Sequence, residues 1–300
     1  MNKFMKKCVI AGIILVVAGG IMAATAVTYG ADLHNIVPRG GDFWKDTLSD
    51  FSFEDLDYEN QPKGSEDYYD FDFEVPEEKG QQIYTTGTAK SLSADIRAGK
   101  VYIIEDPAVS ELTIYCNKKD GNWNLKDEND EIELTTGGGL MSEDMDLVMI
   151  ISVPQGYHFS DVDLEVSRKK GLFKGEGTAP VIACRSISAD DMSLEAKAGA
   201  LSVRQGNVGD LDIKCSVGAV EYTGATTGDI TGECKVGAVM LLLSGKKEDY
   251  NYQLQSRIGG IKIADEQMAA IAGKDNWDYS ADKDMDLECS TGGIEVKFYE

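Results

Sequence analysis

The stretch "IKCSVGAVEYTG" (residues 213–224) and the stretch "GECKVGAVMLLL" (residues 232–243) decide the fold. In each, a cysteine stands three residues before a glycine, and an Ala-Val pair follows that glycine. Apolar and polar residues alternate on both sides of the first glycine, and this two-residue period is typical of β-strands with one buried face. The residues predicted to face the core are Leu211, Ile213, Cys215, Val217, Val220 and Tyr222.

The same turn recurs elsewhere in the chain. The steps from Gly199 to Gly218 and from Gly218 to Gly237 are both 19 residues long. A repeat of this length with apolar alternation predicts a β-solenoid, in which one coil is two short strands and two turns. Each glycine would supply a positive φ or room at the corner where the strand turns. The predicted repeat turns are Gly99, Gly199, Gly218, Gly237, Gly259 and Gly292.

The position three residues before the glycine predicts a packing column rather than a chemical site. In register on adjacent strands, Cys215 and Cys234 would have Cβ atoms about 4.8 Å apart, outside the usual range for a disulfide. Buried free thiols behave as small hydrophobic groups. Whether Cys116 and Cys184 pair across the fold stays open, because sequence separation does not fix their distance. The predicted column consists of Ile96, Ala196, Cys215, Cys234, Ser256 and Cys289.

Composition supports an all-β body. The 300 residues are 42% hydrophobic but only 8% aromatic, and 32 glycines indicate many tight turns. The formal net charge is -23. A surface this acidic repels phosphate backbones, so nucleic acid is not an expected partner.

The N-terminus predicts a membrane anchor. Residues 1–7 carry three lysines and form a short cytoplasmic tail, and residues 8–28 are uncharged and long enough to cross a bilayer as a helix. The protein is therefore expected in the cell membrane, single-pass, with its C-terminal domain extracytoplasmic. A cleavable signal peptide is the alternative, because the small residues at 23–26 could be cleaved by a signal peptidase.

Residues 29–80 are expected to link the anchor to a β-repeat domain over residues 81–300. Between positions 42 and 80 there are 14 acidic residues against Lys45, Lys63 and Lys79. Self-repulsion predicts an extended, solvated spacer. Its aromatic residues leave an alternative open, in which they form a docking strip for a partner or edge strands on the domain. The aromatics in question are Phe51, Phe53, Tyr68, Tyr69, Phe71 and Phe73.

Two further segments are candidate contacts. The insert "RKKGLFKGEG" is basic on an acidic body, and we expect either a protruding solvated loop or a contact for an anionic polymer or lipid head group. The C-terminal "GGIEVKFYE" has no obvious cap and predicts an edge open to strand addition. The candidate contact loop consists of Arg168, Lys169, Lys170 and Lys174.

The sequence predicts no enzyme, cofactor or metal site. It has only two histidines, His34 and His158, and lacks CxxC, HExxH and GxxxxGK motifs. A Ser/His/Asp site would have to use His158, which is more simply a polar residue at a strand entrance. Exposed carboxylate pairs such as Asp190/Asp191 and Asp284/Asp286 leave sugar hydrolysis as a minor alternative.

Three stretches carry a family resemblance: "DIRAGKVYI" (residues 95–103), "VPQGYHFSDVDLEVS" (residues 153–167) and the run over residues 194–224. They resemble the bacterial putative adhesin family of domains of unknown function, over roughly residues 81–300. The resemblance implies a β-solenoid-like exterior domain, often behind one transmembrane helix and sometimes associated with envelope stress systems. It implies no catalytic residues. The basic insert departs from the family pattern, which leaves the local coil count open.

The expected function is therefore a membrane-anchored, extracytoplasmic binding, adhesion or scaffolding module at the bacterial cell envelope. The expected partners are the membrane, through the N-terminal helix, and a surface protein or anionic wall polymer. The alternative is a regulatory sensor of envelope stress that acts through a membrane partner.

Overall fold

A computed structural model describes residues 75–137, 147–167, 180–258, 260–264, 266–269 and 273–299. These belong to one compact unit over residues 74–300. Within the described ranges the elements are strands and one single-turn 3-10 helix, η5 (Lys247–Asp249), so the all-β prediction is confirmed. None of the helical structure in these ranges is long and apolar enough to cross a bilayer. The anchor predicted over residues 8–28 lies outside them.

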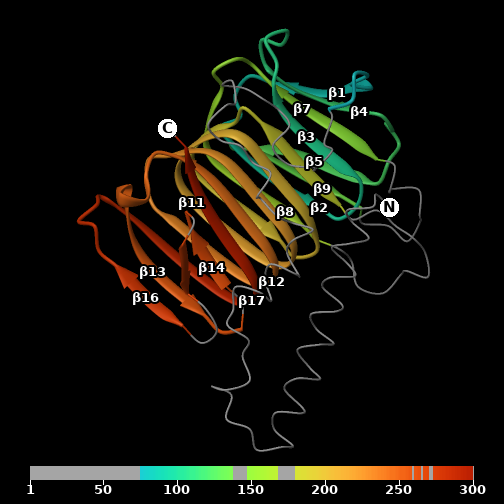
Figure 1. The fold of residues 1–300 in the computed structure, drawn as a ribbon. Helices are drawn as coiled ribbons and strands as arrows, with labels where there is room; N and C mark the ends of the chain where they lie inside the picture. The colour runs from blue at the N-terminus through green and yellow to red at the C-terminus, as the bar shows by residue number, and fades with distance from the viewer. Residues whose placement is uncertain are drawn as a thin grey trace, which may run out of the picture. The chain divides into compact units, whose positions relative to one another are not determined.

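The strands form a single curled sheet whose central part is parallel (Figure 1). We call the strands that precede the corner glycines the first ladder. Its members, each paired in parallel with the next, are β6 (Glu131–Thr136), β2 (Ser91–Ile96), β8 (His158–Val166), β10 (Ser188–Ala196), β11 (Gly199–Thr226), β12 (Ile230–Ser244), β17 (Lys283–Tyr299) and β13 (Tyr250–Ser256).

The strands that follow the corners form the second ladder. The long strands β11, β12 and β17 run through the corner and contribute to both ladders. Residues 200–204 of β11 also pair with β9, so this strand enters the second ladder twice. The second ladder consists of β7 (Val148–Val153), β3 (Lys100–Glu105), β9 (Val181–Arg185), the matching parts of β11, β12 and β17, and β14 (Gly260–Ile263).

Antiparallel strands flank both ends of the parallel region. At one end β5 (Trp123–Glu128) pairs with β6, and β4 (Leu112–Cys116) pairs with β7 and with β1 (Gln81–Thr86). At the other end β16 (Lys274–Trp277) pairs with β13, and β15 (Glu266–Ala269) pairs with β14.

The C-terminal strand is internal, so the expectation of an open C-terminal edge is wrong. β17 pairs with β12 on one side and with β13 and β14 on the other. It matches β12 from Ile230/Met285 to Ser244/Tyr299, including the two cysteines and the two corner glycines. β13 and β14 lie outside β17 although they precede it in sequence, and each carries an antiparallel neighbour on its other side.

The predicted packing column is confirmed by the strand register. Ala196 pairs with Cys215, Cys215 with Cys234, and Cys234 with Cys289. Ser256 extends the column beyond Cys289 at one end. At the other end, Val166 pairs with both Ala196 and Ile96 and so lies between them in the column. All members are buried.

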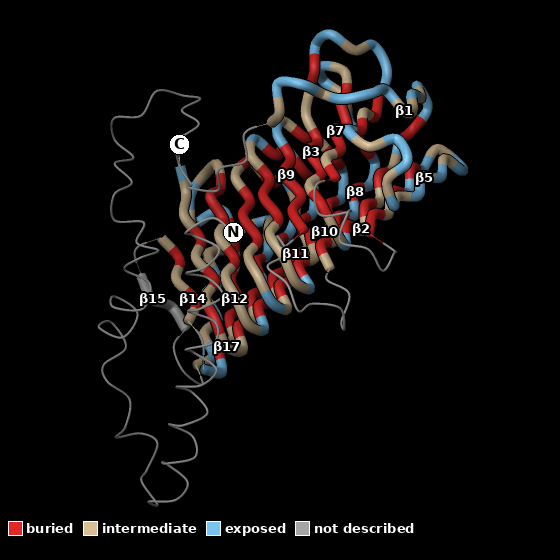
Figure 2. Tube along the Cα trace, turned by 90° about the vertical axis from the view of Figure 1, so that its right-hand side faces the viewer, coloured by how far each residue is buried: buried red, intermediate tan, exposed pale blue. Residues whose placement is uncertain are grey.

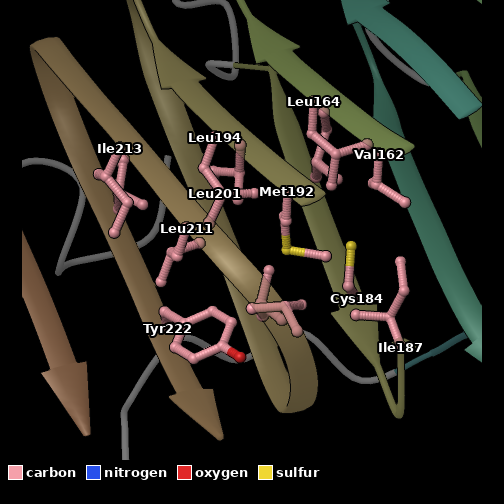
Figure 3. Packing of buried hydrophobic residues seen from close by; sticks show 14 of the residues in the cluster. Val162, Leu164, Cys184, Ile187, Met192, Leu194, Leu201, Leu211, Ile213 and Tyr222 are labelled. Atoms are coloured by element: carbon pink, nitrogen blue, oxygen red, sulfur yellow. The ribbon is translucent and has the colours of Figure 1, made fainter. Parts of the chain in front are cut away.

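The inner side of both ladders forms one hydrophobic core. Figure 2 shows buried residues recurring at alternate positions along neighbouring strands, and Figure 3 shows Leu211 and Ile213 on the same side as Tyr222. Val220 and Tyr222 are buried as predicted. Val217 is the exception, with 54% of its surface exposed. It immediately precedes Gly218, where the chain turns, so the strand alternation that would bury it ends there.

The corner glycines stack on one another because a side chain does not fit. Gly218 has φ +137°, and a Cβ there would lie 2.1 Å from the carbonyl oxygen of Gly199. Cβ atoms on Gly237 and Gly292 would lie 2.3 Å from the carbonyl oxygens of Gly218 and Gly237, respectively. Each corner therefore packs backbone against backbone.

The cysteines of the described ranges are all free and buried. Cys116 and Cys184 form no disulfide, which answers the question that the sequence left open. Burial raises the pKa of the Cys184 thiol, so it is protonated and unreactive at neutral pH.

Candidate binding surfaces

The outward side of the first ladder carries rows of carboxylates. Asp161, Asp191 and Asp210 lie opposite one another on β8, β10 and β11. A parallel row two residues further along the strands contains Asp163, Ser193, Asp212, Thr231 and Asp286. Neighbouring members of a row are separated by about 4.8 Å, the spacing of paired strands. We call this surface the acidic face.

Crowding on the acidic face disfavours ionisation of two of its carboxyls. Desolvation raises the pKa of Asp161, and the charge of Asp191 raises it further. Desolvation also raises the pKa of Asp163, with Asp161 adding to the effect. These carboxylates repel one another, so a bound cationic group would relieve an existing electrostatic cost.

Local donors hold several of the carboxylates in place. The Asp229 backbone N–H donates to Asp210 Oδ1 at 2.8 Å, and the Asp284 N–H donates to Asp229 Oδ1 at 2.7 Å. Thr231 Oγ1 donates to Asp212 Oδ1 at 2.7 Å. The acidic rows are therefore presented in a fixed geometry, which suits recognition of a partner with repeated positive charges.

Cations on this side gather next to the corner glycines, where each already pairs with a carboxylate. Lys197 Nζ lies 2.7 Å from Glu165 Oε2. Lys235 Nζ lies 3.3 Å from Glu233 Oε1, and Arg257 Nη2 lies 3.3 Å from Glu288 Oε1. In the rows further from the corner Asp212 also pairs with Lys214, and the other aspartates keep an excess of negative charge.

The structure brings His158 into a Ser/His/Asp group. Its Nδ1 lies 2.9 Å from Ser188 Oγ and its Nε2 lies 2.9 Å from Asp190 Oδ1, across an open hollow of about 390 Å³. The side chains of His158 and Asp190 are 51% and 69% exposed. A catalytic triad needs a shielded carboxylate and donors for an oxyanion. Here Asp191 and Asp210 also line the hollow, and their charge would oppose a developing oxyanion.

The two carboxylate pairs singled out from the sequence lie in different surroundings. Asp190 and Asp191 line the hollow beside His158. Asp284 accepts from Asn251 Nδ2 at 3.0 Å, and Asp286 lies in an acidic row. Among the described residues, no group of three or more His, Cys, Asp or Glu side chains has an arrangement that could hold a metal ion.

Sequence reasoning missed a buried polar group on the outward side of the second ladder. Ser202 Oγ donates to Glu221 Oε2 at 3.1 Å, and Arg204 Nε lies 3.8 Å from Glu221 Oε1. Burial raises the pKa of Glu221 to about 7, while Arg204 and Ser202 act in the opposite direction. Alternation assigns Glu221 to the outside correctly, but no signal in the sequence indicates that this part of the outside is shielded.

The remaining predicted site residues fall into two groups. Gly99, Gly199, Gly218, Gly237 and Gly292 all lie at corners between the ladders and have positive φ. Gly259 and the candidate contact loop lie outside the described residues, and so does the linker as far as residue 74.

Comparisons with known proteins give distant structural likenesses only. No model of a protein family matches the chain, and no curated protein matches it in sequence. A putative cell adhesion protein from Clostridium sporogenes is 13% identical, with a TM-score of 0.37 over 74% of this chain and 100% of that one. A putative adhesin from Bacteroides fragilis is also 13% identical, with a TM-score of 0.32 over 72% and 97%. One from Parabacteroides merdae is 11% identical, with a TM-score of 0.22 over 72% and 95%. At such TM-scores these likenesses support no inference about function.

Proposed function

We propose that this chain is a membrane-anchored, extracytoplasmic β-solenoid that acts as a binding, adhesion or scaffolding module at the bacterial cell envelope. The observation that carries the proposal is the acidic face, where Asp161, Asp191 and Asp210 repeat at the strand spacing. A regular, broad and charged surface on a rigid sheet is suited to recognition of another surface rather than to chemistry in a cleft.

The acidic face favours a partner with positive charges, such as a basic surface protein. Its carboxylates would repel an anionic wall polymer. A polymer of that kind would have to use the basic residues at 168–174 instead. The proposal includes no catalytic activity, because the group formed by His158, Ser188 and Asp190 is open to solvent and surrounded by negative charge.

The proposal is tested by crosslinking the full-length protein in its own membranes and identifying the captured proteins, beside a truncated chain of residues 1–80. Binding through the solenoid predicts partners that require residues 81–300. Capture of the same partners by residues 1–80 would instead support a sensor that works through its anchor.

A variant with fewer negative charges then tests whether the acidic face is the surface that binds the partner. The full-length triple variant Asp161→Asn/Asp191→Asn/Asp210→Asn should lose its partner. The matched control, Glu77→Gln/Asp120→Asn/Asp282→Asn, removes the same charge from exposed positions elsewhere and should retain it. Equal binding by both variants would remove the acidic face from the proposal.

A further inference from the structure

The sheet ends in four edge strands. β5 and β16 terminate the first ladder, and β1 and β15 terminate the second ladder through β4 and β14. Each of the four pairs with a single neighbour among the strands of the described ranges. β16 forms one end of the sheet in Figure 1, and β1 and β5 lie together at the opposite end in Figure 2. Such an edge presents a row of backbone N–H and C=O groups to a strand of another molecule.

The pairing inside the sheet shows how readily its strands accept a neighbour. β17 pairs in register with β12 on one side and with β13 and β14 on the other, although β12 is not its neighbour in sequence. The contacts are made by backbone groups, which every strand possesses. A strand of a second copy could use the same groups at an open edge. Association at both ends would join copies into an open chain.

The two edge strands of the first ladder each direct an aspartate toward the core side. Asp127 of β5 is paired with Ile132, and Asp275 of β16 is paired with Leu254. Directly paired residues of antiparallel strands lie on the same side of a sheet, and Ile132 and Leu254 belong to the hydrophobic core. A strand added outside β5 or β16 would therefore separate these carboxylates from water. Burial of an ionised carboxylate without compensating partners is strongly unfavourable.

Asp127 has one partner within the domain. The hydroxyl of Tyr84, on β1, donates to Asp127 Oδ2 and so connects the edge strands of the two ladders. The hydrogen bond to Asp127 raises the pKa of Tyr84, so the phenol stays protonated and remains the donor. A carboxylate offers about four acceptor sites, and one neutral donor fills only one of them. The charge of Asp127 therefore still depends on contact with water.

A lysine immediately precedes each of these aspartates. Lys126 and Lys274 occupy exposed, outward positions on β5 and β16, respectively. Lys126 forms an ion pair with Glu133 of β6. Lysines and inward-pointing charges are two ways in which edge strands avoid pairing with other molecules. The same Lys-Asp pair thus stands on the edge strands at opposite ends of the first ladder.

The two edge strands of the second ladder are interrupted by bulges instead. The pairing of β1 with β4 passes over Ile83, so β1 has one residue more than its partner there. The pairing of β15 with β14 passes over Met268 in the same way. In both cases the extra residue belongs to the edge strand. A bulge bends and twists its strand, so the outer edge is no longer a straight row of backbone groups.

We propose that the four edge strands prevent copies of this chain from joining end to end, and that the Lys-Asp pairs at 126–127 and 274–275 block the first-ladder edges. The partner that an unblocked edge would accept is a second copy of this chain. The protein therefore acts as a separate unit rather than as one link of a fibre. The inference does not depend on the proposed function or on the membrane anchor.

Opening one end tests the block on β5. The full-length variant Lys126→Thr/Asp127→Val replaces both blocking residues with residues that favour strands. Two opened ends can pair with each other, so we expect a closed dimer with twice the mass of the native chain, measured by light scattering in detergent. The amides of β5 should gain protection from hydrogen exchange. An unchanged mass, or association that leaves β5 unprotected, would overturn the proposal.

Opening both ends tests the block on β16. Adding Lys274→Thr/Asp275→Val to the first variant leaves each copy with two unblocked ends. We expect open chains whose mean length grows with protein concentration, and added protection of the amides of β16 as well as β5. A variant that stops at the dimer would overturn the assignment of residues 274–275.

Two controls separate an open edge from other causes of association. Asp212→Val/Lys214→Thr makes the same substitutions on β11, which is paired with β10 and β12 on its two sides there. Tyr84→Phe removes the hydrogen bond to Asp127 and keeps the carboxylate. Both controls should keep the mass of the native chain. Association of either control would mean that added apolar surface or weakened folding is sufficient, and would overturn the proposal.

Discussion

The two outward surfaces of this sheet lie on either side of the same corner glycines but differ in chemistry. The acidic face has carboxylates in rows and remains accessible. The outward side of the second ladder, which we call the second-ladder outer face, has a buried apolar row that includes Tyr102 and Ile150. On both surfaces, the outward residues alternate along the strands with residues of the same hydrophobic core. The difference teaches that alternation identifies the inner side of a sheet but does not determine how far the outer side is exposed to solvent.

The largest effect is expected where the two ladders join. Gly292→Ala places a Cβ 2.3 Å from the carbonyl oxygen of Gly237, so the corner must open. We expect a loss of about 3 kcal/mol or more in the free energy of unfolding, measured by urea denaturation. The adjacent Gly293→Ala is the matched control, because a Cβ there meets no atom within 4 Å. Similar losses for the two variants would contradict the stacked-corner geometry.

The second prediction compares the two outer surfaces. Ile150→Ala removes a side chain that is 0% exposed on the second-ladder outer face and should cost about 2–4 kcal/mol in the full-length protein. Val217→Ala removes two methyl groups from a side chain that is 54% exposed on the first-ladder side, and should change stability by less than about 0.5 kcal/mol. If Ile150→Ala is equally mild in thermal and urea denaturation, the second-ladder outer face is not shielded.

The third prediction uses the buried carboxyl of Glu221. Because its pKa is raised from 4.5 to about 7 in the folded protein, between these pH values the folded chain holds a proton that the unfolded chain has released. The free energy of unfolding therefore falls as the pH rises through this window. Glu221→Gln cannot ionise. Relative to the native chain it should gain about 2 kcal/mol between pH 5 and pH 8.

Urea titrations of both chains at several pH values between 5 and 8 provide this measurement. The difference between the two chains cancels the titration of Asp161 and Asp163, whose pKa values are also raised. A difference that does not change with pH would mean that Glu221 is ionised in the folded protein at low pH, and hence is well solvated.

The sequence predicts much of the inner side of the sheet and little of the spatial order. Spacing from the glycines places Cys215, Cys234 and Cys289 in one buried column, as the register confirms. It does not reveal that β17 lies between β12 and β13, because the stretches around the corner glycines have similar alternating patterns. Pattern alone gives no preference between such neighbours.

The candidate surfaces show the same division. Alternation assigns Asp163, Asp212 and Glu221 to the outside. Only the fold distinguishes the first two, which lie in an accessible row, from the third, which is buried. The contact between His158 and Asp190 joins residues 32 positions apart in sequence and depends on the register of β8 with β10.

The smallest effect is expected on the acidic face itself. Ser193 lies between Asp163 and Asp212 in register, so Ser193→Lys places a cation among repelling carboxylates. At low ionic strength we expect a gain of about 0.5 kcal/mol in the free energy of unfolding, reduced by the lost hydrogen bond between Ser193 and Asp163. In 1 M salt the Debye length is about 3 Å, so the gain should disappear.

The Ser193→Met variant separates packing from charge, because it adds a side chain of similar length without a cation. If Ser193→Met is as stabilising as Ser193→Lys, or if the gain survives in 1 M salt, repulsion among the rows is not a significant cost.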